Sequence, residues 1–403
     1  MNKKLLIAVL LVLAVGSVAW GFRYGLRFKD FHWESAALFL RGENPYQWFF
    51  DGRDFQGVAV DATQAPSTIA FILPYGLFSH YVGNALWAVS NVVFLGMFWF
   101  FVSRFQSFRV SKFQGFKVSK FQGFKVSRFQ GFKVSGRETL LVLFAVFALG
   151  SPCRVVFETG QGGLFSLAFF AAAYWAMERK KPFWLVGFLM AVSLFKYTFA
   201  VPLAFIFLFR RQWKAMAVCA GIHAGLTVLM GWWTGTNPVT LVLQSMKIGT
   251  ILNPCGGDAD WAAMAHFMGM DIAVPSLVGY AVFGVLLFVL SFAGSRDSLL
   301  KLATFAVIAN VMFYHRVYDF VTLVFPLIYA VLHREEKGTV ARAIRYATYA
   351  TVGYTFFVGK VFYMLQSPMG VPIAFALEHA LLFCLLLKCF SADKNDSDRV
   401  LSA

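Results

Sequence analysis

Long uninterrupted apolar runs constrain this chain more than any other feature of its sequence. Runs such as Leu5–Trp20, Ala215–Trp233 and Val274–Ala293 contain no charged residue. Runs of roughly 17–25 apolar residues match the hydrocarbon thickness of a bilayer. Because backbone inside lipid must satisfy its own hydrogen bonds, these runs are expected to be helices. The whole chain is 59% hydrophobic and 14% charged, whereas a soluble domain carries about 25% charged residues. We therefore predict an all-α polytopic membrane protein.

The formal charge of +16 is explained by membrane topology rather than by a polyanionic partner. Basic clusters stand at the ends of the apolar runs, namely Lys3-Lys4, Arg179-Lys180-Lys181, Arg210-Arg211 and Arg334 through Arg345, and nine more Lys or Arg lie between Arg104 and Arg137. Loops rich in Lys and Arg stay in the cytoplasm. We therefore expect a multi-pass protein of the plasma (inner) membrane with a cytoplasmic N-terminus. The expected partner of this charge is the lipid bilayer, and no nucleic acid is expected.

Residues 103–136 contain a basic octapeptide repeat. The units read VSRFQSFR, VSKFQGFK, VSKFQGFK and VSRFQGFK, followed by VSG. A period of eight fits neither a helix nor a solenoid. The repeat is suited to an anionic lipid surface, or it is a low-complexity expansion in a tolerant loop. We expect a cytoplasmic loop inserted within a single transmembrane domain that spans residues 1–403.

About twelve transmembrane helices are expected. They cover residues 5–20, 83–102, 139–151, 162–178, 183–196, 197–209, 215–233, 271–293, 301–313, 317–332, 344–364 and 371–390. The pair around Lys196 is too short for straight crossings, so we expect broken or tilted helices there. Residues 67–80 include Pro74. Both ends of this segment must be extracytoplasmic if the basic loops are to stay in the cytoplasm, so we predict a re-entrant or interfacial helix. Residues 151–160 and 234–270 are expected to be outer loops, and residues 391–403 a polar cytoplasmic tail.

Ionisable residues gather on the predicted extracytoplasmic face, where they are candidates for function because such groups are costly near lipid. Acidic residues, Asp30 and Glu34 among them, lie in the first loop, whereas basic residues lie at the outer ends of later spans. This arrangement suits an anionic headgroup held by cations while a carboxylate acts nearby. Asp30 opens a predicted short helix that ends at Gly42. It is either the N-cap of that helix or a general base whose pKa is raised by partial desolvation.

At these residues the chain resembles a known family. Asp30-Phe31, followed by Ala37, Leu40, Gly42 and Asn44-Pro45-Tyr46, is similar to the first-loop signature of glycosyltransferase family 87. These are polyprenol-phosphate-sugar-dependent transferases of the GT-C type, typically mannosyltransferases. Three later segments agree, namely Gln64 to Pro74, Thr159 to Leu164 with Gly163 where Asn is usual, and Gly187 to Tyr197 with Pro202 later than usual. The resemblance covers roughly residues 25–335.

The resemblance implies a GT-C-like bundle with a short extracytoplasmic first-loop helix. It implies that a hexose, mannose by preference, moves with inversion from a polyprenyl-phosphate donor to an extracytoplasmic glycolipid or glycan acceptor, with Asp30 as general base. The candidate substrate-binding residues are Glu34, Arg41, Arg154, Gln161, Lys196, His315 and Arg316. No cofactor and no metal are expected.

Ordinary structural roles stay open for the same residues. Lys196 is long enough to snorkel to the interface, Gln161 suits a helix start, and Arg154 is spaced to pair with Glu158. His315-Arg316 with Asp319 is spaced for a local salt bridge, and His223 for an interhelical hydrogen bond. Asp258 and Asp260 form a D-x-D motif. Cys153 and Cys255 both lie in predicted outer loops, and whether they form a disulfide is left open.

A transporter or flippase of a lipid-linked sugar is the alternative from another functional class. Transporters of this kind are built from repeats with broken helices at matching positions of two halves. The sequence contains one recognisable broken pair, around Lys196, and its polar groups concentrate on one face. This pattern favours an enzyme.

Overall fold

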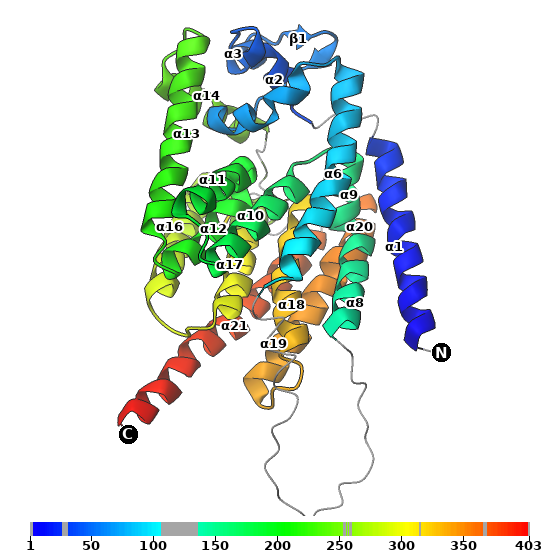
Figure 1. Cartoon of the computed structure of the whole chain (residues 1–403), viewed down its shortest axis with the longest axis vertical. Helices are drawn as coiled ribbons and strands as arrows, with labels where there is room; N and C mark the ends of the chain where they lie inside the picture. Colours follow the sequence, from blue (N-terminus) through cyan, green and yellow to red (C-terminus); the bar gives the residue numbers. More distant parts are fainter. Residues whose placement is uncertain are drawn as a thin grey trace, which may run out of the picture.

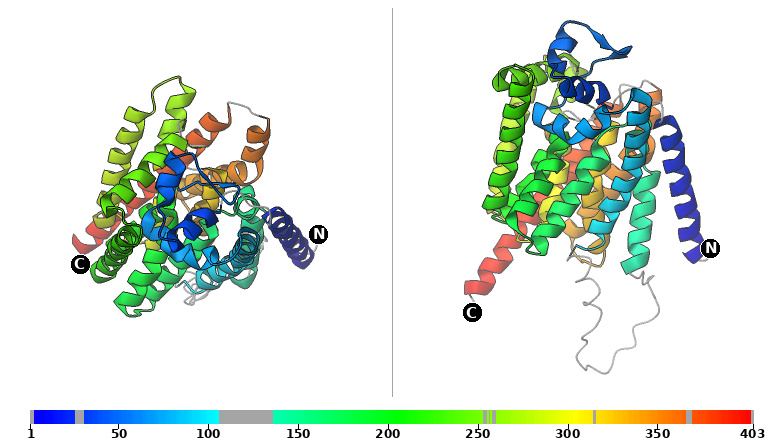
Figure 2. Two further views of the ribbon diagram at one scale, coloured as in Figure 1. Left: turned by 90° about the horizontal axis from the view of Figure 1, so that it is seen from above. Right: turned by 45° about the horizontal axis from the view of Figure 1, so that its top comes forward.

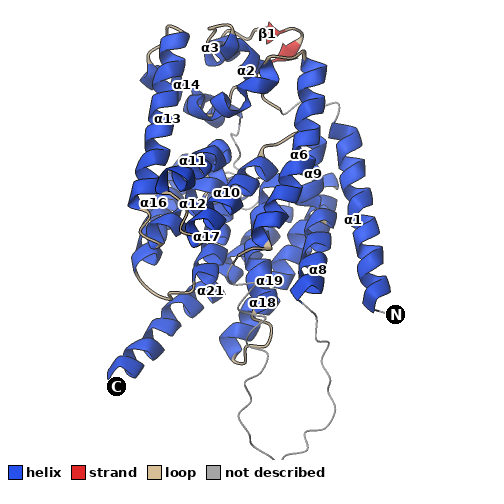
Figure 3. Cartoon of the chain, viewed as in Figure 1, coloured by secondary structure: helices blue, strands red, loops and turns tan. Residues whose placement is uncertain are grey.

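The computed structural model describes residues 3–25, 31–105, 136–252, 255, 257, 260–313, 316–365 and 369–401. Those residues are almost entirely helical (Figure 3). Within them, the strand pairing is one short antiparallel hairpin, β1 (Asp54–Phe55) with β2 (Val58–Ala59). The fold class predicted from the apolar runs is confirmed. Most of the octapeptide repeat, residues 106–135, lies outside the described residues.

The helices and the hairpin follow one another along the chain, coloured from blue to red in Figure 1. In chain order they are α1 (Lys3–Gly25), α2 (Trp33–Leu40), α3 (Pro45–Phe50), β1, β2, α4 (Pro66–Ile69), η1 (Ala70–Ile72), α5 (Leu73–Gly76), α6 (His80–Val102), α8 (Gly136–Leu149), α9 (Ser151–Thr159), α10 (Gly163–Glu178), α11 (Phe183–Ser193), η2 (Leu194–Lys196), α12 (Tyr197–Phe209), α13 (Trp213–Trp233), α14 (Pro238–Leu252), α15 (Trp261–Phe267), α16 (Ala273–Phe292), α17 (Ser298–Met312), η3 (Val317–Leu323), α18 (Val324–Leu332), α19 (Thr339–Gly353), η4 (Tyr354–Val358), α20 (Gly359–Met364) and α21 (Gly370–Leu401).

Several helices have the length and apolarity of a membrane span, so the chain is a multi-pass membrane protein. In the described part of the chain they are Lys4–Tyr24, His80–Val102, Phe183–Phe209, Trp213–Trp233, Ala273–Phe292 and Gly370–Ser391. Glu138–Leu149 and Ser151–Thr159, bent by 54° against each other, make a further candidate. The structure does not confirm a count of twelve, because Gly163–Glu178, Ser298–Met312 and Val317–Leu332 are apolar but short.

The apolar stretch Phe183–Phe209 is a hairpin rather than one crossing. A straight helix of its 27 residues would separate its ends by about 40 Å. Instead, the ammonium of Lys214, just after the stretch, lies 5.9 Å from the centroid of the Phe183 ring at its start. Gly187 of α11 also packs closely on Ala215 of α13. The broken pair predicted around Lys196 is therefore confirmed, and its two arms return to the same end of the molecule.

Helix α17 and the segment η3–α18 form a second hairpin of the same kind. Asp297 before α17 lies 3.8 Å from His333 after α18, so these two arms also begin and end together. Arg210 Nη1, after α12, donates to Ser298 Oγ at 3.3 Å. The bases of the two hairpins are thereby joined at one end of the bundle.

The basic clusters share that end, which we name the basic end and define by Arg104, Arg179–Lys181, Arg210–Lys214 and Arg334–Arg345. Phe105 packs on Tyr174 near the end of α10, with ring centroids 4.7 Å apart, and Arg345 Nη1 donates to the carbonyls of His333 and Glu336. The first-loop elements α2 to α5 lie at the opposite end, whereas α1 stands at the periphery (Figure 2).

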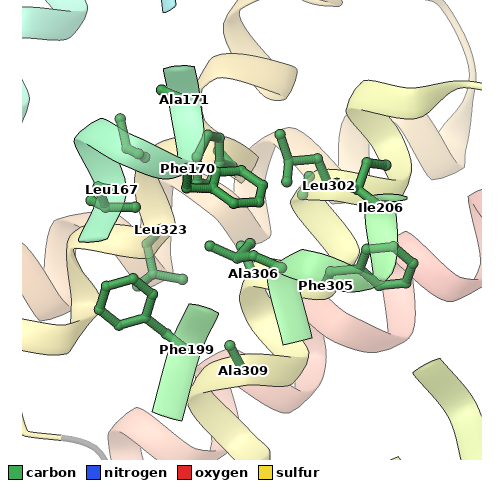
Figure 4. Close-up of a cluster of buried hydrophobic side chains, with 14 of the residues drawn as sticks. Leu167, Phe170, Ala171, Phe199, Ile206, Leu302, Phe305, Ala306, Ala309 and Leu323 are labelled. Carbon is green, nitrogen blue, oxygen red and sulfur yellow. The ribbon is translucent and has the colours of Figure 1, made fainter. Parts of the chain in front are cut away.

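An apolar core holds the hairpins against α10. Side chains of α10, α12 and α17, with Leu323 of η3, converge in it (Figure 4). Small residues at the contact, Ala171, Ala306 and Ala309, are fully buried. Small side chains let helix backbones approach closely, which is the main source of helix association in lipid. The core therefore fixes the positions of the hairpin apices above it.

Two expectations about loops were wrong. Residues 151–160 form α9 rather than a loop, since Pro152 starts the helix and Gly160, at φ +74°, ends it. The expected outer loop 234–270 contains α14 and α15, the second capped by Asp260. The apolar span of α21 ends at Ser391, where the polar tail was predicted to begin, and the helix continues to Leu401. Residues 66–76 form short consecutive helices with prolines in the first turns of α4 and α5, and the re-entrant or interfacial placement of residues 67–80 stays a prediction.

The contact between α11 and α13 provides a first testable prediction. A Cβ at Gly187 would lie 2.5 Å from the carbonyl oxygen of Ala215. We expect Gly187→Ala to destabilise the protein by about 1–3 kcal/mol through overpacking, measured as a lower thermal unfolding midpoint in detergent. Gly221→Ala in α13 is the matched control, because a Cβ there meets nothing within 4 Å. Equal midpoints for the two variants would contradict the close packing.

Candidate functional site

The apices of the two hairpins meet at an ion pair. Lys196 Nζ lies 2.9 Å from Asp319 Oδ1 and donates to Gln161 Oε1 at 3.0 Å. The ammonium also lies 4.0 Å from the centroid of the Tyr318 ring. Lys196 is 7% exposed and Asp319 1% exposed. Three segments distant in sequence thus bring their polar side chains to one point, which we name the apex cluster (Gln161, Lys196, Arg316, Tyr318 and Asp319).

Arm length sets the depth of the apex cluster. Helices α11, α12 and α17 have 11, 13 and 15 residues, or roughly 16–22 Å of rise. A bilayer core is about 30 Å thick. The cluster therefore lies inside the bundle, past its middle when measured from the basic end. Charges at such a depth are costly unless paired, and the pairing of Lys196 with Asp319 meets that requirement.

The backbone at the apices is fixed by local contacts. Lys196 stands where η2 gives way to α12, and its amide donates to Ser166 Oγ of α10 at 2.9 Å. Gly162 lies directly under Phe195, because an added Cβ would come within 2.1 Å of that ring. Only a residue without a side chain allows this approach, so the glycine beside Gln161 brings α10 and η2 together.

Asp319 serves two partners at once. Besides the ion pair, its Oδ2 accepts from the amide of Arg316 at 3.3 Å, within a capping box at the start of η3. The sequence spacing predicted only a local pair of Asp319 with His315 and Arg316. The contact with Lys196 was missed, since nothing in the sequence places the two hairpins together. Arg316 is exposed at this apex, and His315 lies outside the described residues.

An aromatic contact joins the first loop to the apex cluster. Trp87 of α6 is fully buried and donates from Nε1 to the carbonyl of Gly160 at 2.6 Å. Phe31 stacks on Trp87, with ring centroids 4.6 Å apart. The indole of Trp87 thus contacts both Gly160, which precedes Gln161, and Phe31, which follows Asp30. Asp30 itself lies outside the described residues.

The first-loop helix begins later than the sequence predicted. Helix α2 starts at Trp33 with His32 at the N-cap, so the interpretation of Asp30 as its N-cap was wrong. The predicted end of the helix is confirmed, because Gly42 follows it at φ +74° and donates to the carbonyl of Phe39. Glycine is favoured there because a Cβ opposes this left-handed conformation.

A second polar cluster lies in the first loop and consists of His32, Glu34, Asp61 and Gln64. Glu34 Oε1 accepts from the amide of Asp61 at 3.2 Å. The His32 ring contacts the carbonyl of Asp61 through Nδ1 and the amide of Gln64 through Nε2. Burial raises the pKa of Glu34 to about 8, and the nearby Asp61 carboxylate acts in the same direction. Glu34 is therefore largely a neutral acid at pH 7.

Helix α4 connects the first loop with the apex region, since it packs against both η2 and α13. Ser67 of α4 lies 2.8 Å from His223 Nδ1 of α13, whose Nε2 contacts the carbonyl of Ala191 at 3.1 Å. The predicted interhelical hydrogen bond of His223 is confirmed. Histidine thus ties α4, α11 and α13 together beside the hairpin that carries Lys196.

The other described candidates contact residues outside the apex cluster. Arg154 pairs with Glu158 at 3.2 Å on α9, as the i,i+4 spacing predicted. Arg41 is exposed and its guanidinium covers the Phe55 ring at 4.7 Å. Cys153 is buried and Cys255 exposed, and both are free.

A metal site is not indicated where the chain is described. No group of three His, Cys, Asp or Glu in these residues is arranged to hold an ion. The second aspartate of the D-x-D motif, Asp260, caps α15 by accepting from the amide of Ala263. Asp258 lies outside the described part of the chain.

A known family matches most of the chain. The model of glycosyltransferase family 87 matches residues 63–332. This region includes both hairpins and the whole apex cluster, whereas the first-loop motif from Asp30 to Tyr46 precedes it. No curated protein matches the chain.

Burial of Glu34 predicts a pH-dependent stability. In the folded protein its pKa is about 8 against an ordinary 4.5, so between these values the unfolded chain ionises while the folded chain does not. Wild-type stability should fall over this window, whereas Glu34→Gln mimics the neutral acid and should not. We expect Glu34→Gln to be more stable than wild type by a few kcal/mol at pH 8.5, since one pKa unit is about 1.4 kcal/mol.

The measurement is the thermal midpoint in detergent at pH 5 and pH 8.5, with Glu43→Gln of the same loop as control. The advantage of Glu34→Gln should be small at pH 5 and large at pH 8.5. An advantage of equal size at both pH values would mean that Glu34 is not held neutral.

Proposed function

This chain belongs to glycosyltransferase family 87, and we propose that it moves a hexose, mannose by preference, from a polyprenyl-phosphate donor to an extracytoplasmic acceptor. The chain is a glycosyltransferase and a multi-pass membrane protein. The acceptor is a glycolipid or a glycan met at the membrane surface. Because the family is one of transferases, the alternative of a sugar transporter is not proposed.

The observation that carries the proposal is the buried ammonium of Lys196 at the apex of a short hairpin. A cation held at this depth suits an anion that enters from the bilayer rather than from water. A lipid phosphate is an anion of this kind, because its isoprenoid chain stays in the hydrocarbon while its phosphate group lies near the interface. Gln161 from another segment adds a polar side chain that contacts the ammonium, and Arg316 is an exposed cation at the same apex.

The proposed reaction is a single inverting displacement. The acceptor oxygen forms a bond to the anomeric carbon, and the bond from that carbon to the phosphate oxygen breaks. The bonding electrons leave with the phosphate, which gains a second negative charge, and the acceptor proton passes to the carboxylate of Asp30. Cations placed where charge develops lower the barrier. Lys196, Arg316, Arg154 and His315 are proposed for the phosphate, with Gln161 orienting Lys196.

The first loop is proposed to receive the acceptor. Its elements cover the end of the bundle opposite the basic end (Figure 1), and the motif with Asp30 belongs to it. Glu34 is proposed to support the acceptor side of the loop from within as a buried neutral acid, and Arg41 lies at the exposed edge of the same loop. The positive-inside pattern assigns the basic end to the cytoplasm. The site then faces the extracytoplasmic side of the plasma membrane.

The test is sugar release from labelled polyprenyl-phosphate-mannose by membranes that contain the protein. We expect wild type to consume the donor and Asp30→Asn to lose activity by about 10²–10⁴-fold, the usual effect of losing a general base. Asp54→Asn, an exposed aspartate of β1, is the matched control and should retain wild-type activity at equal expression.

Two other results would change the proposal. Consumption of donor by Asp30→Asn at the wild-type rate would keep the transferase and remove Asp30 as base. No consumption by wild type, with other polyprenyl-phosphate sugars also inert, would remove the lipid-phosphate donor class.

A further inference from the structure

We propose that Asp319 is a positioning residue that holds the Lys196 ammonium before the donor binds and yields it to the donor's phosphate as negative charge develops there. The inference rests on the proposed function, because it concerns the cation assigned to the leaving phosphate. It adds a residue that touches neither the sugar nor the acceptor, and that acts through Lys196.

The ammonium of Lys196 is already surrounded in the structure. Asp319 Oδ1 at 2.9 Å, Gln161 Oε1 at 3.0 Å and the face of the Tyr318 ring at 4.0 Å all contact it. An incoming phosphate oxygen must therefore take the place of one of these partners. The carboxylate of Asp319 and the phosphate are both negatively charged. If the phosphate replaces the carboxylate, the Lys196 ammonium therefore keeps an anionic partner throughout.

Asp319 keeps an anchor when the ammonium leaves. Its Oδ2 accepts from the amide of Arg316 at the start of η3, and its carbonyl accepts from Thr322 Oγ1 at 3.2 Å. The contact with Lys196 uses the other oxygen, Oδ1. The backbone capping therefore holds Asp319 in place independently of Lys196.

The charges decide when the exchange is favourable. The phosphate of an intact donor is a diester with one negative charge, which equals that of the carboxylate. The leaving phosphate is a monoester that approaches two negative charges. At equal distance the attraction of an ammonium to a dianion is about twice its attraction to a monoanion. Lys196 thus gains little by moving to the intact donor and much more by moving to the leaving group.

This difference has two effects on turnover. An interaction that strengthens only as the bond breaks lowers the barrier without tightening the ground state. After transfer, Asp319 competes with the lipid phosphate for Lys196 and so promotes product release. Without Asp319, the ammonium should stay on the phosphate, which predicts tighter ligand binding and slower turnover.

The first experiment measures binding of farnesyl phosphate to the purified full-length protein in detergent. We expect Asp319→Asn to bind it about tenfold more tightly than wild type, whereas the Lys196→Gln/Asp319→Asn double variant binds it more weakly than wild type. The double variant removes both buried charges together, so neither is left unpaired. Removing Asp319 also makes the site more positive overall, and this change alone would tighten phosphate binding even without Lys196. The double variant therefore shows whether the tighter binding acts through Lys196.

Controls and kinetics complete the test. Asp297→Asn removes a comparable helix-capping aspartate at the start of α17 and should leave binding unchanged, and Asp319→Glu should restore wild-type affinity. With labelled donor, Asp319→Asn should lower both KM and kcat and increase inhibition by added polyprenyl phosphate.

The outcomes distinguish this inference from the function beneath it. Farnesyl phosphate that binds wild type and folded Asp319→Asn equally would overturn the role of Asp319 and leave the transferase proposal standing. The same conclusion follows if the tightening persists when Lys196 is replaced. If neither farnesyl phosphate nor the labelled donor binds wild type, the proposed donor is not a lipid phosphate, and this inference is then wrong as well.

Discussion

The contact between Lys196 and Asp319 organises the candidate site of this molecule. Two opposite charges buried in a membrane protein are costly to separate, so the apices that carry them must stay together. The apolar core formed by α10, α12 and α17 brings the apices into contact, and the lengths of the arms decide their depth. The first loop then lies over this point rather than elsewhere, since Trp87 joins Phe31 to the carbonyl before Gln161.

The first loop combines two kinds of attachment. Aromatic stacking on Trp87 and packing of α4 against η2 place it on the bundle, whereas hydrogen bonds around Asp61 fix its internal shape. Glu34 belongs to the second kind. A buried carboxyl group that is neutral at pH 7 can donate a hydrogen bond inside the loop, which a carboxylate cannot. The loop is therefore an ordered part of the candidate site and not a simple connection between helices.

The sequence predicted the features that depend on local composition. Apolar runs indicated membrane helices, the short runs on either side of Lys196 indicated a broken pair, and Gly42 indicated the end of the first-loop helix. Composition does not reveal whether a 13-residue apolar helix crosses the bilayer or turns back, which is why the expected number of spans was not confirmed. It also concealed α9 and α14, whose sequences are less apolar than a span but helical in the bundle. Gln161 and Lys196 were each identified as candidates, but their contact and the partnership with Asp319 follow from packing between distant segments.

The two short hairpins bear on how the chain enters the membrane. Each begins and ends among the basic residues of one end, as the contacts of Lys214 with Phe183 and of His333 with Asp297 indicate. Neither hairpin has to carry a long hydrophilic loop across the bilayer during synthesis. The charged apices need only reach the interior, and each remains unpaired until the other arrives. The candidate site can therefore assemble only when the later hairpin docks on the earlier one, so its formation depends on the order in which the two hairpins enter the membrane.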